Sequence, residues 1–122
     1  MLALAPDKWA AYKQLNAYVY DAVKKRYPKI KLFPTLQYEY LLGKNAGSSV
    51  SDRRRWDGRE AKVQASEARD LLRHADLVAL STYPYMVYSN EVTPGYYNTG
   101  LAISQDLNKP IAVEQTGYTT RN

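Results

Sequence analysis

The stretch Leu77-Val-Ala-Leu-Ser-Thr-Tyr83 decides the fold class of this chain. It is continuously apolar at first and turns polar at its C-terminal end, which is typical of a buried strand in a parallel sheet. Similar stretches on either side of it predict further strands at residues 30–37 and 110–116. Pro34 weighs against the first of these as a central strand, because such a strand needs its backbone N–H groups for pairing.

Helical patterns separate these strands and predict an α/β fold. The first helix is expected to begin near Pro6 and to stop at Pro28, because proline suits the first helical position and cannot continue a helix. The second is expected at residues 60–74 and the third at 95–107, in which Gly100 is unfavourable. Strands that alternate with helices indicate a parallel sheet with right-handed crossovers. The apolar stripe expected on the first helix consists of Tyr12, Leu15, Val19, Ala22 and Val23.

Length and composition exclude several classes of protein. The 122 residues fit one small domain and are too few for a complete (β/α)8 barrel, which takes about 200–250. Without cysteine there are no disulfides, no thiolate catalysis and no cysteine-bound zinc, and a single His argues against a histidine-rich metal site. No apolar run approaches the roughly 18 residues of a membrane span, and the first residues lack the features of a signal peptide. Neither a cofactor nor a metal ion is expected.

Two compositional features concern possible ligands. Twelve Tyr against one Phe give most aromatic rings a hydroxyl group, which suits a wet cleft or a sugar site. The net charge is +5, and 15 of the 17 Lys and Arg residues lie within the first 73 positions. Solvated helix faces account for such a bias, and so does a nucleic-acid-binding module built on Lys24–Arg26 and Arg53–Arg55, with Trp56 for base stacking. These two basic clusters are expected at opposite ends of the sheet, so nucleic acid is not the favoured partner.

The carboxyl ends of the strands carry the candidate site, because ligands bind there in α/β proteins. Glu114 follows Pro110-Ile-Ala-Val113, a run expected to be buried, and a carboxylate in such a place needs an ion pair or a catalytic role. The alternative is a rim glutamate paired with a neighbouring Lys or Arg. The side chains delivered to this edge are Gln37, Tyr38 and Glu39 from the first strand, Ser81, Thr82, Tyr83 and Tyr85 from the second, and Glu114, Gln115 and Tyr118 from the third.

Several segments resemble a known enzyme family. Asn108-Lys-Pro-Ile-Ala-Val-Glu-Gln-Thr-Gly-Tyr118 resembles the seventh-strand motif of clan A glycoside hydrolases, which are (β/α)8 barrels whose nucleophile is a Glu ending that strand. Ala75-Asp-Leu-Val-Ala-Leu-Ser-Thr-Tyr-Pro-Tyr85 resembles their sixth strand, which ends in a Tyr-Pro-aromatic turn. The helix Trp9–Tyr27 and the strand at 30–37 resemble the fourth helix and fifth strand. Endo-β-1,4-galactanase-like enzymes are the most similar subfamily.

The resemblance implies that residues 1–122 are a C-terminal-half part of a (β/α)8 TIM barrel, carrying strands five to seven. It implies a retaining hydrolase of a β-linked polysaccharide, secreted or periplasmic, with Glu114 as the nucleophile. Tyr83 would hydrogen-bond this nucleophile. The substrate-binding residues implied by the resemblance are Tyr83, Gln37 and Glu39 in the sugar subsites and Tyr85 and Tyr118, which would stack on pyranose faces.

The chain departs from the family pattern at the general acid/base. That residue is a Glu in an Asn-Glu pair ending strand four, and Asn90-Glu91 is expected in the loop after the second predicted strand instead. The chain alone is therefore expected to be inactive and to need the missing strands as partners, because three strands of a barrel leave two sheet edges open. A non-catalytic carbohydrate-binding barrel relative is one alternative reading, and a basic nucleic-acid-binding α/β module is the other.

Overall fold

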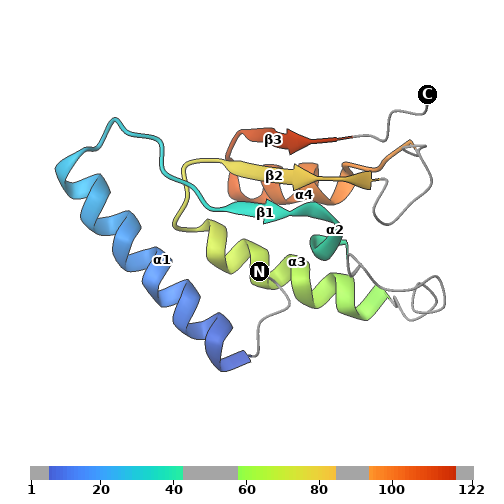
Figure 1. Cartoon of the computed structure of the whole chain (residues 1–122), viewed down its shortest axis with the longest axis horizontal. Coiled ribbons are helices and arrows are strands. Elements are labelled where there is room, and N and C mark those ends of the chain that lie inside the picture. Colours follow the sequence, from blue (N-terminus) through green and yellow to red (C-terminus); the bar gives the residue numbers. More distant parts are fainter. Residues whose placement is uncertain (1–5, 43–57, 85–93, 118–122) are drawn as a thin grey trace.

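Helices and parallel strands alternate along the chain (Figure 1). The computed structural model describes residues 6–42, 58–84 and 94–117. The α/β class and the parallel sheet predicted from the sequence are confirmed. The elements in chain order are α1 (Pro6–Arg26), β1 (Thr35–Gln37), α2 (Tyr38–Leu41), α3 (Gly58–Leu72), β2 (Val78–Thr82), α4 (Asn98–Leu107) and β3 (Ile111–Thr116).

The described sheet has three strands in the order β1-β2-β3, and both neighbouring pairs run parallel. All residues of the central strand β2 are buried, as its apolar sequence requires. β2 and β3 match the strands predicted at 77–83 and 110–116 to within one residue at each end. The strand predicted at 30–37 is wrong in its first half, because only Thr35–Gln37 pairs with β2.

Hydrogen bonds to Asp76, and not strand pairing, fix the position of the segment before β1. The Asp76 N–H donates to Leu32 O over 2.8 Å, and the Leu32 N–H donates to Asp76 Oδ2 over 2.7 Å. Pro34 has no N–H group and cannot donate a hydrogen bond to a ladder. The paired strand therefore begins only at Thr35.

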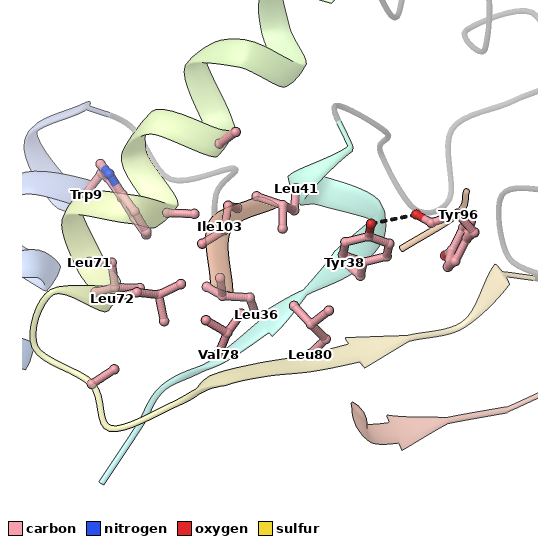
Figure 2. Packing of buried hydrophobic residues seen from close by; sticks show 13 residues of the cluster. Trp9, Leu36, Tyr38, Leu41, Leu71, Leu72, Val78, Leu80, Tyr96 and Ile103 are labelled. Carbon is pink, nitrogen blue, oxygen red and sulfur yellow. Dashed lines mark hydrogen bonds between the residues drawn. The ribbon is translucent and has the colours of Figure 1, made fainter. Parts of the chain in front are cut away.

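Helices cover one face of the sheet and form the core with it (Figure 2). Leu36 of β1 and Val78 and Leu80 of β2 point toward these helices and are completely buried. Since side chains alternate along a strand, the neighbours of these residues lie on the opposite face. None of the helices within residues 6–42, 58–84 and 94–117 covers that face, which is termed the helix-free face (Figure 1). The helices contribute the buried residues Ala65, Ala68, Leu71 and Leu72 of α3 and Ile103 of α4.

Gly100 lies where α4 packs closely on the sheet. A Cβ atom at this position would lie 3.0 Å from Leu80 Cδ1 and 3.2 Å from Ile111 Cδ1, so a larger residue would require these side chains to shift by a few tenths of an ångström. α4 starts at Asn98 instead of the predicted residue 95, because Gly95 adopts a positive φ of 79° in the turn before the helix.

The predicted extent of α1 is correct, but the stripe predicted to face the core is wrong. Leu15 and Val19 are 59% and 41% exposed, and only Tyr12 of the stripe packs against the core. Tyr18 beside them is exposed as well, so α1 presents an apolar surface to solvent in this structure. The described part of the chain contains no helix that is both long and apolar enough to cross a membrane.

A polar stripe attaches α1 to the rest of the molecule. Lys13 Nζ lies 2.6 Å from Glu67 of α3, and Trp9 Nε1 donates to the same carboxylate. One turn further, Asn16 Nδ2 donates to the carbonyl oxygen of His74 over 3.0 Å. Hydrogen-bond donors that match acceptors on α3 and in the segment after it therefore favour the side of α1 that turns inward, which hydrophobic periodicity alone does not reveal.

Asp76 also attaches α1 to the rest of the molecule, and the pKa of its carboxyl group is strongly shifted. Its side chain accepts hydrogen bonds from Tyr20 over 2.8 Å and from Lys24 over 3.0 Å, in addition to the bond from Leu32. Burial by itself raises the pKa of this carboxyl, but the three donors outweigh burial and lower its pKa from 3.8 to about 2. A drop of this size corresponds to about 2 kcal/mol of stability at neutral pH.

We expect Asp76→Asn to reduce the free energy of unfolding by about 2 kcal/mol at pH 7, measured by urea denaturation. The folded-state pKa lies below the unfolded value, so the difference from wild type should be complete above pH 3.8 and vanish as the pH falls through about 2. Asp70→Asn is the control, because Asp70 is half exposed and its ion pairs are long, with 3.6 Å between the charged atoms. Equal losses in the two variants would contradict the role assigned to Asp76.

Candidate functional site

A β-bulge at Glu114 interrupts the pairing between β2 and β3. Val113 pairs with Leu80 and Gln115 pairs with Ser81, so Glu114 is an extra residue in β3 without a partner in β2. Bulges of this kind re-aim a side chain and are over-represented next to active sites. The bulge therefore gives Glu114 a position that regular pairing would not allow.

The Glu114 side chain lies on the helix-free face and is exposed. Its Oε2 accepts a hydrogen bond from Thr35 Oγ1 of β1, which reaches it across the intervening strand β2. Thr35 faces this side because it alternates with the core residue Leu36. Among the described residues, the partner of Glu114 is thus a hydroxyl group and not the Lys or Arg of the rim alternative.

The burial predicted for the run before Glu114 is wrong. Ala112 is exposed and Val113 is 44% exposed, whereas Ile111 alone packs against the core. β3 is an edge strand of the described sheet, so one side of it has no strand partner among the described residues, and most of its residues are exposed. The apolar run is consistent with a surface that a further element could cover.

A row of polar residues crosses the helix-free face beside Glu114. Gln37, Ser81 and Gln115 stand in register on the three strands, and Ser81 Oγ donates to Gln115 Oε1 over 3.3 Å. Gln37 and Ser81 alternate with core residues, and Gln115 meets Ser81 across the bulge, so all three side chains extend to the same side as Glu114. Together with Thr35 they form a polar surface at the carboxyl ends of parallel strands.

Glu39 lies at the same end of the sheet but is completely buried in α2. Its Oε1 accepts hydrogen bonds from Thr82 Oγ1 at 2.7 Å, from the Tyr83 N–H at 2.8 Å and from Tyr96 OH at 2.8 Å. Its Oε2 accepts one from Gln37 Nε2 at 2.5 Å. These five residues, termed the Glu39 network, join the carboxyl ends of β1 and β2 to the segment before α4.

Tyr96 stays a hydrogen-bond donor within the Glu39 network. Burial raises the pKa of its hydroxyl group, and the hydrogen bond to the Glu39 carboxylate raises it further, while the contact with Thr82 acts in the opposite direction. The Thr82 and Tyr96 hydroxyl oxygens lie 2.8 Å apart, so the two hydroxyls and Glu39 Oε1 form a closed triangle of contacts. This arrangement leaves the carboxylate little freedom to turn.

The structure brings some of the predicted site residues together and separates others. Gln37 and Glu114 share the helix-free face, and the half-buried Tyr83 directly follows β2. A direct sugar contact by Glu39, as predicted, would require this side chain to leave its four donors. Tyr85 and Tyr118 lie outside the described residues. The carry-over of roles onto these positions stays a prediction.

Sequence reasoning missed Thr35 and Tyr96. Thr35 could have been found, because it stands two residues before Gln37 and must share its face in a strand. Tyr96 carried no local signal, since its hydrogen bond to Glu39 spans 57 positions in the sequence. The one-turn helix α2 was also missed, and it directs Tyr38 and Glu39 into the interior instead of toward a ligand.

Other sites receive little support from the described residues. No group of three or more His, Cys, Asp or Glu side chains within residues 6–42, 58–84 and 94–117 is placed to hold a metal ion. Lys24 of the predicted basic cluster is engaged by Asp76, and the second cluster, Arg53–Arg55 with Trp56, lies outside the described residues. Comparison of this chain with protein-family models, with curated proteins and with solved structures finds no match.

Proposed function

We propose that the three βα units form strands five to seven of a (β/α)8 barrel whose complete form is a retaining glycoside hydrolase acting on a β-linked polysaccharide. The observation that carries this proposal is the placement of Glu114, an exposed carboxylate on a β-bulge at the carboxyl end of a parallel sheet. Active sites of (β/α)8 barrels lie at this end of the strands. The polar row beside Glu114 supplies groups that can hydrogen-bond sugar hydroxyls.

The surfaces left exposed support a larger barrel. The exposed apolar side of α1, the exposed edge strand β3 and the polar helix-free face would each be covered if further βα units continued the sheet around a barrel. In a closed barrel the helix-free face becomes the interior, and the carboxyl ends of the strands surround the substrate.

In the proposed mechanism Glu114 attacks the anomeric carbon and forms a covalent glycosyl ester. The glycosidic bond breaks as a second carboxylic acid protonates the leaving oxygen, and a water molecule activated by that same residue then releases the sugar. Retaining enzymes hold the two carboxyl groups about 5–5.5 Å apart. Among the described residues Glu114 is the exposed carboxylate at this end of the sheet, so the acid/base must come from strand four of the complete barrel.

A non-catalytic carbohydrate-binding relative is the second candidate. It is favoured by the burial of Glu39, which removes the other carboxylate of this edge from solvent. The sequence that precedes these units in the full-length protein discriminates between the two. A strand ending in Asn-Glu supports the enzyme, and its absence supports the binding protein.

The full-length protein should release reducing sugars from at least one member of a panel of β-1,4-linked galactan, mannan, xylan and glucan. The first product should be the β-anomer, observed by proton NMR before mutarotation, because double displacement retains the configuration. An initial α-anomer would contradict the nucleophile assignment. Retention of a polysaccharide on an affinity gel without any release of sugar would favour the binding protein instead.

A further inference from the structure

The Glu39 carboxylate determines which way the Gln37 amide faces. Gln37 Nε2 donates to Glu39 Oε2 over 2.5 Å. An ionised carboxylate only accepts hydrogen bonds, so it selects the NH2 group of a neighbouring amide and repels the carbonyl oxygen. The two ends of an amide diverge from one carbon atom, and Gln37 Oε1 is therefore directed away from Glu39.

Glu39 itself is held so firmly that it cannot adapt to Gln37. Its other oxygen accepts hydrogen bonds from the Thr82 hydroxyl, the Tyr83 N–H and the Tyr96 hydroxyl, and the whole side chain is buried. Turning the carboxylate away from these buried donors would leave them unsatisfied, which is strongly unfavourable. The orientation of Gln37 thus follows from contacts on two other elements of the fold.

Gln37 Oε1 has no donor among the described residues and belongs to the half-buried side chain that begins the polar row. An acceptor in this position takes the proton of a sugar hydroxyl, whereas an NH2 group can only donate to the hydroxyl oxygen. The buried Glu39 therefore determines whether the polar row presents a hydrogen-bond acceptor or a donor at β1.

We propose that Glu39 is a positioning residue that makes Gln37 Oε1 an acceptor for a hydroxyl group of the bound polysaccharide. This inference rests on the proposed function and assigns to Glu39 a role other than direct contact with sugar. Gln37 is the residue that determines the specificity, and Glu39 acts through it.

Glu39→Gln is the variant that separates positioning from support of the fold. The new side chain keeps an oxygen for Thr82, Tyr83 and Tyr96, and its NH2 group must now face Gln37. Gln37 can satisfy it only by turning its own amide, which presents Nε2 to the ligand. The buried groups stay paired, so the melting temperature should remain within about 3 °C of wild type.

The test measures hydrolysis by the full-length protein of the polysaccharide that it degrades in the panel above. Glu39→Gln and Gln37→Ala should each raise KM about 10- to 100-fold with a smaller change in kcat, as expected for loss of one buried hydrogen bond. The double variant should be no worse than either single variant, because both remove the same acceptor. Gln115→Ala is the matched control, since Gln115 belongs to the same row without touching Glu39, and its effect should add to that of Glu39→Gln.

Three outcomes would overturn the inference. A wild-type KM for Glu39→Gln, or additive effects of Glu39→Gln and Gln37→Ala, would refute it while leaving hydrolysis and the proposed function intact. Absence of hydrolysis across the panel would refute the proposed function together with this inference. Nitrogen-15 NMR reports on the amide independently of activity, because the Gln37 side-chain protons should be protected from exchange in wild type and lose that protection in Glu39→Gln.

Discussion

Glu114→Gln should lower kcat/KM of the full-length protein on its polysaccharide by at least about 1,000-fold, since removal of a nucleophile from a catalytic set costs this much or more. An amide oxygen cannot form the glycosyl ester on which the proposed retaining mechanism depends. Glutamine can still accept the hydrogen bond from Thr35, so the bulge and the melting temperature should be preserved.

Asp106→Asn is the matched control for this change. Asp106 is an exposed carboxylate on α4 that pairs with Arg69 over 2.6 Å, on the helical side of the molecule. The same loss of charge there should leave kcat/KM within about twofold of wild type, because exposed ion pairs contribute little. Hydrolysis that survives in Glu114→Gln at more than about a tenth of the wild-type rate would show that Glu114 is not the nucleophile.

Local chemistry sets the boundaries of most elements, and for this reason the sequence predicts them well. Proline at position 6 and again at position 28 limits α1 to its observed length. The apolar run in β2 identifies the central strand, because the centre of a parallel sheet has no exposed face.

Features that depend on distant partners could not be predicted in this way. α1 packs through Lys13 and Asn16 because Glu67 of α3 and the His74 carbonyl after α3 accept their hydrogen bonds. The bulge at Glu114 exists only in the pairing with β2, and nothing in the single strand reveals it. For the candidate site, the sequence placed Gln37, Glu114 and Gln115 at one end of the sheet, where the structure has them, but strand periodicity could not show that Glu39 turns inward.

The turn into α2 explains why the sequence does not reveal where the residues directly after β1 point. After Gln37 the chain stops alternating and forms a single helical turn, in which Tyr38, Glu39 and Leu41 are all buried. Leu41 joins the core with Leu36, so the turn is stabilised by burial on the helical side of the sheet. Both residues predicted to follow Gln37 toward a ligand are thereby placed in the interior.

Tyr38→Ala should consequently be the most destabilising of the substitutions considered, with a loss of about 4 kcal/mol in the free energy of unfolding. The Tyr38 ring is completely buried between Tyr96, at 5.1 Å between ring centroids, and Tyr97, at 5.6 Å. Its hydroxyl donates to the Tyr96 carbonyl over 2.6 Å and accepts from the Gly100 N–H over 3.4 Å. Removal of the ring therefore leaves a cavity and unpaired polar groups where α2 meets α4.

Tyr38→Phe divides this loss into its two parts. The phenyl ring keeps the packing and removes only the hydroxyl, so urea denaturation should show a loss of about 1 kcal/mol. Tyr18→Ala is the control for removing a tyrosine, and it should cost less than about 0.5 kcal/mol because Tyr18 is 74% exposed on α1.

Since Tyr96 also donates to Glu39, loosening of the contact between Tyr38 and Tyr96 should weaken the Glu39 network as well. A loss below about 1 kcal/mol in Tyr38→Ala would mean that α2 does not pack into the core, and the buried position of Glu39 would then lose its support.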